Sequence, residues 1–334
     1  MKNARYYIGP MSLNVVDAVI DHSSKAPIGL IPSRRQVDYS SGYVNNWNTA
    51  NFADYVRSRS LNVSLCRDHG GPLQGSTEDD GLVSILHDAE SLDLIHIDPF
   101  KQEKDMQKAA LVTVELIQQA YKRNPNVFYE VGTEEAIRKY EPEDLQRFLS
   151  IVRSNLKDHE YQQIKYAVVQ SGTGLDLAAR RNTGEFNQKR LEAFVMTCKP
   201  FGLLSKEHNG DYLIELRQLA PRFDVGLDAI NIAPEFGQIE TEWYINTCKK
   251  DEQTYETLFG ICYHSGKWKK WVNQHNEKQL TKDSYVWMTV HYLLSDPKFT
   301  QHIKRLFPNA DSEIKQMVNH RLDSLYEQTK NYSF

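Results

Sequence analysis

Short β-favouring apolar runs recur along this chain, and their spacing constrains its fold more than any other feature of the sequence. The runs start, at intervals of 27 to 39 residues, at Pro27, Leu61, Leu92, Asn126, Lys165, Phe201, Asp228 and Leu258. Charged segments that favour helix lie between them, and in residues 107–123 Ala110, Val114 and Ile117 recur at helical spacing. Strands that alternate with helices at this period form parallel βαβ units, and eight units predict an α/β fold of the (β/α)₈ TIM-barrel type.

A doubly wound open sheet is the alternative to the barrel. Such a sheet usually has fewer strands and a glycine-rich nucleotide-binding loop after the first strand, whereas SRRQVDYSSG follows the first run here. The chain has no linker rich in Pro, Gly or Ser, so we expect one barrel over residues 1–280. Residues 281–334 look helical and exceed one closing helix, so we expect a C-terminal helical extension packed on the barrel, as a cap or an oligomer contact.

Charge and composition exclude several classes of protein. The 334 residues include 40 Lys and Arg against 44 Asp and Glu, a formal net charge of −4, which argues against a nucleic-acid or membrane-surface binder. No apolar run approaches the roughly 20 residues that span a bilayer, and the N-terminus lacks the apolar core of a secretion signal. The 4 cysteines are widely spaced, so we expect free thiols in a cytoplasmic protein and no cysteine zinc site.

Polar and charged side chains follow almost every predicted strand at its C-terminal end. In a barrel these ends form one mouth, where catalysis occurs. Asp68 and His69 after the second run and His208 after the sixth are the sharpest candidates, because imidazole binds zinc-like ions and a neighbouring carboxylate can move a proton. The carboxylates that could complete such a site are Asp98, Glu130 and Glu134. The alternative is that both histidines only form hydrogen bonds within their loops.

Two further residues near the predicted mouth remain open to different interpretations. His96 lies within the third run on the face it shares with Asp98, where it either lines the barrel or is a buried, hydrogen-bonded histidine. Lys206 ends the sixth run, where a Schiff-base lysine could reach the mouth, but Glu207 and Asp211 nearby would favour its charged form.

Substrate contacts are expected from the same strand ends. The seventh and eighth ends occupy the usual phosphate-binding quarter of a barrel, and a serine hydroxyl with a lysine there could hold a phosphate. The predicted substrate-binding residues are Arg34, Gln36, Asp98, Gln170, Asn209, Asn231, Ser265 and Lys267.

The strand-end motifs resemble a known family. RDHGGP, IHIDPF, VGTEEA, VVQSGTG, KEHNGDYL and YHSGKWKKW occur in the order found in the accessory, Z-type subunit of class II D-tagatose-1,6-bisphosphate aldolase and the related sugar-phosphate 4-epimerases. The resemblance covers roughly residues 13 to 330. It implies a metal-dependent (β/α)₈ barrel acting on ketose phosphates, with Asp68 as the acid/base, His69 and His208 as metal ligands and Glu134 as the carboxylate ligand.

We therefore expect a cytoplasmic, metal-dependent lyase of the class II aldolase type, or a sugar-phosphate epimerase, acting on a phosphorylated or otherwise anionic ketose. The expected cofactor is Zn²⁺, with Mn²⁺ or Co²⁺ as alternatives, and Glu130 and Lys206 are further catalytic candidates. The chain departs from the family at Asp98-Pro99-Phe100 and at Lys267, so the substrate pocket is expected to be altered. Two alternatives remain: a non-catalytic subunit that stabilises a class II aldolase, and a Schiff-base aldolase that uses Lys206. The expected partners are a sugar and either a second copy of the chain or an aldolase subunit.

Overall fold

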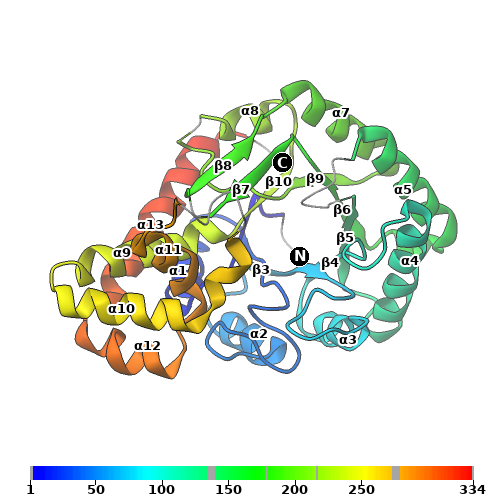
Figure 1. Ribbon diagram of the computed structural model, residues 1–334. Coiled ribbons are helices and arrows are strands. Elements are labelled where there is room, and N and C mark those ends of the chain that lie inside the picture. The colour runs from blue at the N-terminus through cyan, green and yellow to red at the C-terminus, as the bar shows by residue number, and fades with distance from the viewer. Residues whose placement is uncertain (1–2, 134–139, 178, 216, 273–278, 333–334) are drawn as a thin grey trace.

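The computed structural model describes residues 3–133, 140–177, 179–215, 217–272 and 279–332. Its centre is a closed barrel of eight strands, all paired in parallel, in the order β1-β10-β9-β6-β5-β4-β3-β2 (Figure 1). The strands are β1 (Tyr6–Ile8), β2 (Ile28–Leu30), β3 (Val63–Gly70), β4 (Leu94–Ile97), β5 (Phe128–Gly132), β6 (Ile164–Val169), β9 (Leu204–Glu207) and β10 (Ala229–Ile232). The predicted (β/α)₈ barrel is confirmed, because β1 pairs with both β2 and β10 and so closes the sheet.

Seven of the eight predicted runs form barrel strands, and the eighth does not. The run at Leu258 lies in helix α10 (Glu252–Ser265), which begins after the N-cap Asp251 and buries Leu258 and Cys262 at a spacing of four residues. The missing strand is β1, whose three residues are too few to show a period in the sequence. Every predicted strand is therefore one place further along the barrel than the sequence suggested.

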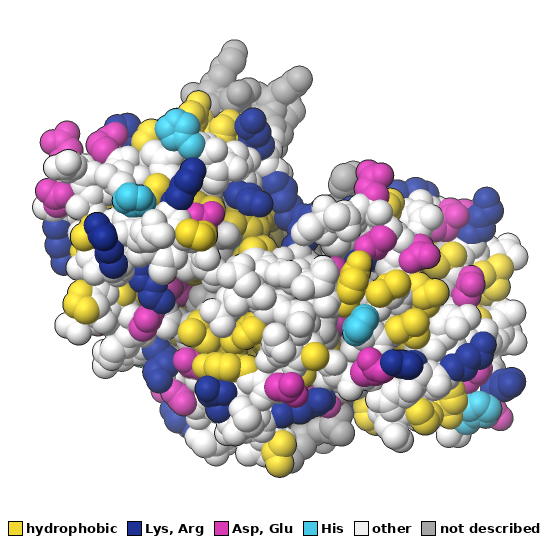
Figure 2. Space-filling view, turned by 90° about the horizontal axis from the view of Figure 1, so that it is seen from below, with side chains coloured by type: hydrophobic (Ala, Val, Ile, Leu, Met, Phe, Trp, Pro, Cys, Tyr) yellow, Lys and Arg dark blue, Asp and Glu magenta, His cyan; other side chains and the backbone are white. Residues whose placement is uncertain are grey.

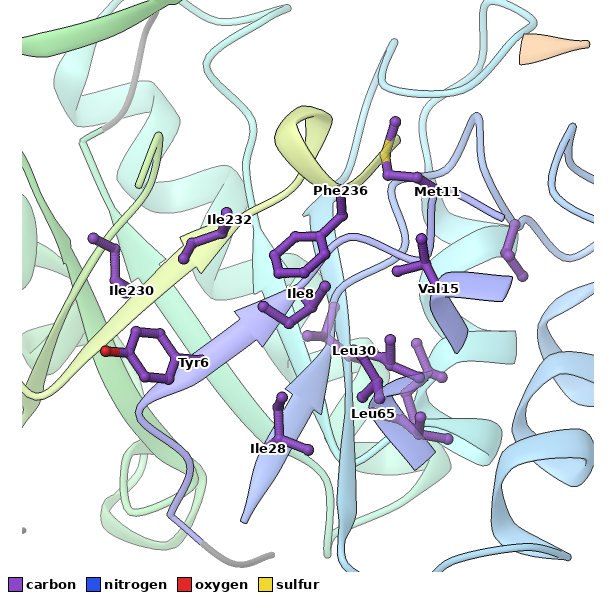
Figure 3. Close-up of a cluster of buried hydrophobic side chains, with 14 of the residues drawn as sticks. Tyr6, Ile8, Met11, Val15, Ile28, Leu30, Leu65, Ile230, Ile232 and Phe236 are labelled. Atoms are coloured by element: carbon purple, nitrogen blue, oxygen red, sulfur yellow. The ribbon is translucent and has the colours of Figure 1, made fainter. Parts of the chain in front are cut away.

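Seven helices follow the first seven barrel strands and bury their apolar faces against the outside of the sheet. They are α1 (Leu13–His22), α2 (Thr49–Arg57), α3 (Leu82–Ser91), α4 (Met106–Arg123), α5 (Pro142–Asn155), α7 (Gln188–Cys198) and α8 (Leu219–Asp224), with the short α6 (Asp158–Tyr161) and η1 (Lys199–Phe201) between them. Figure 3 shows the outward side chains of β1, β2 and β10 meeting Val15 of α1 and Phe236. Strand alternation turns Tyr7 the other way, into a smaller cluster inside the barrel.

The eighth helical position is filled by the last helix of the chain. After β10 the chain forms a helical lobe, made of α9 (Pro234–Cys248), α10, η2 (Lys267–Trp271), α11 (Lys282–Thr289), η4 (Val290–Tyr292), α12 (Pro297–His302) and η5 (Lys304–Leu306). Helix α13 (Ala310–Thr329) then packs between α8 and α1 (Figure 1). The boundary expected at residue 280 therefore falls inside the lobe, and α13 belongs to the barrel rather than to an added tail.

A two-stranded antiparallel hairpin, β7 (Thr173–Asp176) and β8 (Arg181–Gly184), follows β6. At its tip the Arg180 guanidinium lies 4.0 Å from the ring centroid of Trp287 in α11 and 3.4 Å from a carboxylate oxygen of Glu242 in α9. The hairpin thus connects the barrel to the lobe.

The surface is hollowed between the lobe and the barrel, and Lys and Arg side chains lie along this hollow (Figure 2).

All four cysteines are buried free thiols, and free thiols were expected from their spacing. Within the described ranges, none of the helices has the length and apolar character needed to cross a membrane.

Candidate active site

Three imidazoles and one carboxylate meet at the C-terminal ends of β3, β4 and β9. Asp68, His69, His96 and His208 each place one potential ligand atom within 4.8 Å of the others. The ring centroids of the three histidines are 5.0 to 5.4 Å apart. We call these four residues the histidine cluster.

An irregularity at the end of β3 brings Asp68 and His69 to the same cluster. Consecutive side chains of a regular strand point to opposite faces. Here the pairing of β3 with β4 shifts register between Arg67 and Gly70, and His69 has a φ of 48°. This left-handed backbone bends the strand end, as a bulge does, and turns both side chains toward the mouth.

His69 is oriented by Asp98. The Nδ1 of His69 donates to Oδ2 of Asp98 at 2.7 Å, and Asp98 also accepts from the side chain of Gln74 and the backbone N–H of Phe100. Burial raises the pKa of Asp98, but His69, with smaller contributions from His96 and the backbone N–H of Phe100, holds it below its ordinary value. Since an ionised carboxylate only accepts, the proton of His69 is on Nδ1 and the Nε2 lone pair faces the cluster. Asp98, predicted to contact substrate, is bound to His69 and is not among the residues that line the pocket at the barrel mouth.

A second buried carboxylate orients His208. Its Nε2 donates to Oε1 of Glu130 at 2.6 Å, and Oε2 of Glu130 accepts from Lys206 Nζ, also at 2.6 Å. Burial would raise the pKa of Glu130, but the ammonium of Lys206 and the bond from His208 hold it well below its ordinary value. The Nδ1 of His208, 3.9 Å from Oδ1 of Asp68, therefore carries the lone pair. Glu130 is fully buried and contacts the cluster through His208, and it is not among the residues that line the pocket.

The environment of Lys206 opposes the Schiff-base interpretation. The residue is fully buried, its Nζ lies 3.8 Å from the ring centroid of Tyr7, and it forms an ion pair with Glu130. Burial lowers the pKa of Lys206, but Cys66 and the Glu130 carboxylate outweigh it and raise that pKa to about 12. An amine that attacks a carbonyl must be unprotonated and accessible. The neighbours expected from the sequence are not the cause, because Glu207 pairs with Arg222 and Asp211 accepts backbone N–H groups.

His96 is the member of the cluster that the sequence left undecided. It is 1 % exposed, and neither ring nitrogen has a hydrogen-bond partner among the described residues. Burial, with smaller contributions from nearby groups, lowers the pKa of His96 to about 4, so the ring is neutral at physiological pH. Buried polar atoms without a partner are rare in folded proteins. A divalent ion between the three imidazoles would satisfy one of these nitrogens, so the donor set fits a metal that prefers imidazole.

Asp68, His69 and His208 of the cluster line a pocket of about 560 Å³ at the barrel mouth, and His96 is buried beside them. Asp68 is accessible from the pocket, with 17 % of its side chain exposed, and accepts a hydrogen bond from Nδ2 of Asn231 at 3.3 Å. The predicted substrate contacts that do line the pocket are Gln36, Gln170, Asn209 and Asn231.

Three predicted substrate contacts lie elsewhere. Arg34 is buried and forms ion pairs with Asp38 and Asp79, so its guanidinium connects the loop after β2 to the loop after β3. Ser265 ends α10 and Lys267 begins η2, and neither lines the pocket. Both expectations depended on a strand at residue 258 that is a helix. Glu134, the predicted carboxylate ligand, lies outside the described residues.

Sequence reasoning missed the side chains that the lobe and the hairpin deliver to the pocket. These are Lys270, Trp271, His291 and Tyr292 from η2 and η4, and Thr173, Gly174 and Leu175 from β7. The motifs VVQSGTG and YHSGKWKKW contain Thr173, Gly174, Lys270 and Trp271 but do not show that these side chains meet in one pocket. No motif marks His291 and Tyr292, which reach the mouth only when the lobe folds back on the barrel.

Neither the known protein-family models nor the curated protein sequences give a match to this chain. Several solved structures share its fold. A probable tagatose 6-phosphate kinase from Sinorhizobium meliloti 1021 aligns over 98 % of this chain and 100 % of its own, with a TM-score of 0.76 and 15 % identity. The fructuronate-tagaturonate epimerase from Cohnella laeviribosi aligns over 98 % and 81 %, with a TM-score of 0.61 and 9 % identity.

The fructose-bisphosphate aldolase from Campylobacter jejuni aligns over 98 % of this chain and 90 % of its own, with a TM-score of 0.58 and 11 % identity. At such identities these likenesses establish a common fold and no more. The chain is thus a (β/α)₈ barrel that shares its architecture with proteins named for sugar chemistry and carries a histidine cluster at its mouth.

Proposed function

We propose that this protein is a metal-dependent enzyme of the class II aldolase or epimerase type, acting on a phosphorylated or otherwise anionic ketose. The observation that carries the proposal is the histidine cluster, in which two imidazoles are held in defined tautomers and a third is buried with no hydrogen-bond partner among the described residues. Solved structures named as an aldolase and as an epimerase have the same fold, which supports the choice of reaction class by analogy.

The three histidines would hold the metal, with His69 offering Nε2 and His208 offering Nδ1. Zinc suits these ligands, and manganese or cobalt are the alternatives. When bound, a divalent ion supplies a Lewis acid that polarises a carbonyl oxygen. The carboxylates of Asp98 and Glu130 keep the two imidazoles oriented toward it.

Asp68 is the proton carrier in this proposal. Its carboxylate is exposed to the pocket and lies 3.9 Å from both His69 and His208, where it can take the proton of a substrate hydroxyl. Asn231 donates to Oδ1 of Asp68 and so fixes the direction in which the carboxylate points. Release after cleavage of the carbon–carbon bond makes an aldolase, and re-addition to the other face makes a 4-epimerase.

A panel of ketose phosphates, assayed with added zinc or manganese, tests the reaction. Asp68→Asn should abolish turnover while leaving metal content unchanged, and His69→Ala should lose both. Asp54→Asn, on the exposed face of α2, is the matched control and should behave as the wild type. Full activity in both cluster variants contradicts the mechanism.

Elemental analysis separates this function from that of a non-catalytic stabilising subunit. We expect stoichiometric metal after purification with metal salts, and a weaker metal affinity in His96→Phe. The metal-free His96→Phe protein should unfold at the same or higher urea concentration than the metal-free wild type, because the substitution removes buried ring nitrogens that no described residue hydrogen-bonds. A chain that stays metal-free and inactive supports the stabilising subunit instead.

A further inference from the structure

The pocket has a second polar region, which the helical lobe builds. Lys270 and Trp271 of η2 and His291 and Tyr292 of η4 line it, and Tyr43 from the loop after β2 completes it. The ring of Tyr292 lies 3.9 Å from that of His291 and 5.0 Å from that of Tyr43, and its hydroxyl accepts from Trp271 Nε1 at 3.2 Å. We call these five residues the lobe subsite.

Positive charge is concentrated at the lobe subsite. Lys270 lies close enough to Arg35 and Lys101 to be repelled by both, and burial together with this repulsion lowers the pKa of Lys270 to about 8. Within the described part of the chain Lys270 forms no ion pair with a carboxylate, although acidic residues outnumber basic ones in the whole sequence. Three cations from three separate loops thus act on one another here, and no carboxylate of the described residues pairs with Lys270, so the local potential attracts an anion.

A second, independent observation points to a ligand-binding role for the lobe subsite. His291 is 2 % exposed, lines the pocket, and its Nδ1 has no hydrogen-bond partner among the described residues. Burial and the charge of Lys270 lower the pKa of His291 to about 3, so the ring is neutral. A neutral imidazole can donate one hydrogen bond to an oxyanion, and a buried ring nitrogen is expected to have a partner.

We propose that the lobe subsite binds the phosphate group of a phosphorylated substrate, through Lys270 and His291 with Arg35 and Lys101 adding long-range attraction. A phosphate monoester carries about −1.5 to −2 charges at pH 7, which matches this group of cations better than a single carboxylate does. The inference rests on the proposed function and deepens it, because it names the substrate class and separates the anion site from the histidine cluster. In this proposal the lobe subsite takes the place of Ser265 and Lys267, which the sequence predicted as phosphate contacts.

Binding of inorganic phosphate to the metal-free protein, measured by calorimetry, tests the subsite without any assumption about turnover. Loss of one charge-assisted hydrogen bond should weaken phosphate binding about 10- to 100-fold in Lys270→Met. Lys269→Met is the matched control: this neighbouring lysine of η2 does not line the pocket, and the variant should bind phosphate as the wild type does. His291→Phe should weaken binding while keeping the size of the ring.

His69→Ala locates the anion within the pocket. It removes a member of the histidine cluster, so phosphate affinity should be unchanged if the anion lies at the lobe subsite. Equal affinities of Lys270→Met and Lys269→Met overturn the proposal, as does loss of phosphate binding in His69→Ala. Circular dichroism and urea unfolding of each variant should match those of the wild type.

A kinetic comparison distinguishes failure of the subsite from failure of the proposed function. With an active enzyme, Lys270→Met should raise KM for a phosphorylated ketose about tenfold or more and leave KM for the unphosphorylated sugar unchanged. Turnover of a sugar acid or neutral sugar with no effect of Lys270→Met refutes the subsite while the reaction class stands. Phosphate binding that depends on Lys270 in a protein without turnover retains the subsite and refutes the reaction.

Discussion

At the scale of single residues, the site depends on two buried carboxylates that make no contact with the pocket. Asp98 fixes the tautomer of His69, and Glu130 fixes that of His208. Carboxylate–histidine pairs of this kind are known to raise ligand basicity and fix ring orientation around metals. Glu130 differs from Asp98 in that its second oxygen is taken by a buried ammonium, Lys206. The role of this Lys206–Glu130–His208 chain can be tested with variants that change the stability of the protein and its metal affinity separately.

Glu130→Gln should lower both stability and metal affinity. The buried ammonium of Lys206 loses its counter-ion, which costs about 3–5 kcal/mol in the free energy of unfolding. Metal affinity should fall about 10- to 100-fold because a neutral amide orients His208 less firmly. Adding Lys206→Met should restore much of the stability but not the metal affinity, measured by urea unfolding and metal titration. Recovery of both in the double variant contradicts the role given to Glu130.

Asp211 should make stability depend on pH. Burial and the neighbouring Glu235 raise the pKa of Asp211 to about 7 from an ordinary value of 3.8. The folded state therefore holds a proton that the unfolded state has lost between these two values, so stability falls as pH rises from about 4 to about 7. Asp211→Asn keeps an oxygen for the backbone N–H groups of Ala233 and Glu235 and should flatten this fall. Urea unfolding at several pH values measures how the free energy of unfolding falls with pH. The same fall in Asp211→Asn as in the wild type contradicts a raised pKa for Asp211.

At the scale of elements, the β7–β8 hairpin reaches from the barrel mouth to the lobe, and Asn182 of β8 anchors it by donating to the carbonyls of Asn209 and Asp211. Thr173, Gly174 and Leu175 line the pocket, while the tip is held on the lobe by Arg180, which stacks on Trp287 and pairs with Glu242. Both Arg180 contacts are partly exposed, so each contributes little to global stability, while Gln238 of α9 also holds the tip through a buried hydrogen bond to the carbonyl of Leu177.

Arg180→Ala should therefore loosen the hairpin without unfolding the protein. We expect faster amide hydrogen exchange across residues 173–184 and a change of about 1 kcal/mol or less in the free energy of unfolding. Arg181→Ala, whose side chain is exposed beside it, is the control. Equal exchange in the two variants would show that Arg180 does not hold the tip.

Elements also show where prediction from sequence succeeded and failed. The middle strands were identified because each is an apolar run followed by polar residues, and β3 and β9 lead directly into Asp68, His69 and His208. Strand β1 is only Tyr6–Ile8, and the run at Leu258 is as apolar as a strand but is buried at a helical spacing. Short apolar runs do not reveal their period, so only packing decides between helix and strand.

At the scale of the whole molecule, the N-terminal and C-terminal segments of the chain meet at the barrel. Helix α13 occupies the eighth outer position, and Leu322 and Leu325 on it are buried. Arg5, just before β1, donates to the carbonyls of Thr329 and Tyr332. The last helix is therefore part of the barrel core, and the lobe is an insertion before it.

Leu322→Ala should accordingly destabilise the whole barrel. We expect a loss of about 2–5 kcal/mol in the free energy of unfolding, as for other large-to-small substitutions in a core. Met317→Ala on the same helix, where 37 % of the side chain is exposed, should cost much less. Urea unfolding measures both, and equal small effects would mean that α13 is an appendage after all.

The sequence by itself determined the repeating βαβ architecture and most of the histidine cluster, because strand–helix spacing and the residues at strand ends are local properties of the chain. Tertiary structure alone decided which carboxylate holds which imidazole, because Asp98, Glu130 and Lys206 meet the cluster from separate strands of the closed barrel. It also decided the lobe subsite: Lys270 and His291 reach the mouth only because the lobe folds back between β10 and α13. Contacts between segments far apart in the sequence follow from packing, and no spacing along the chain encodes them.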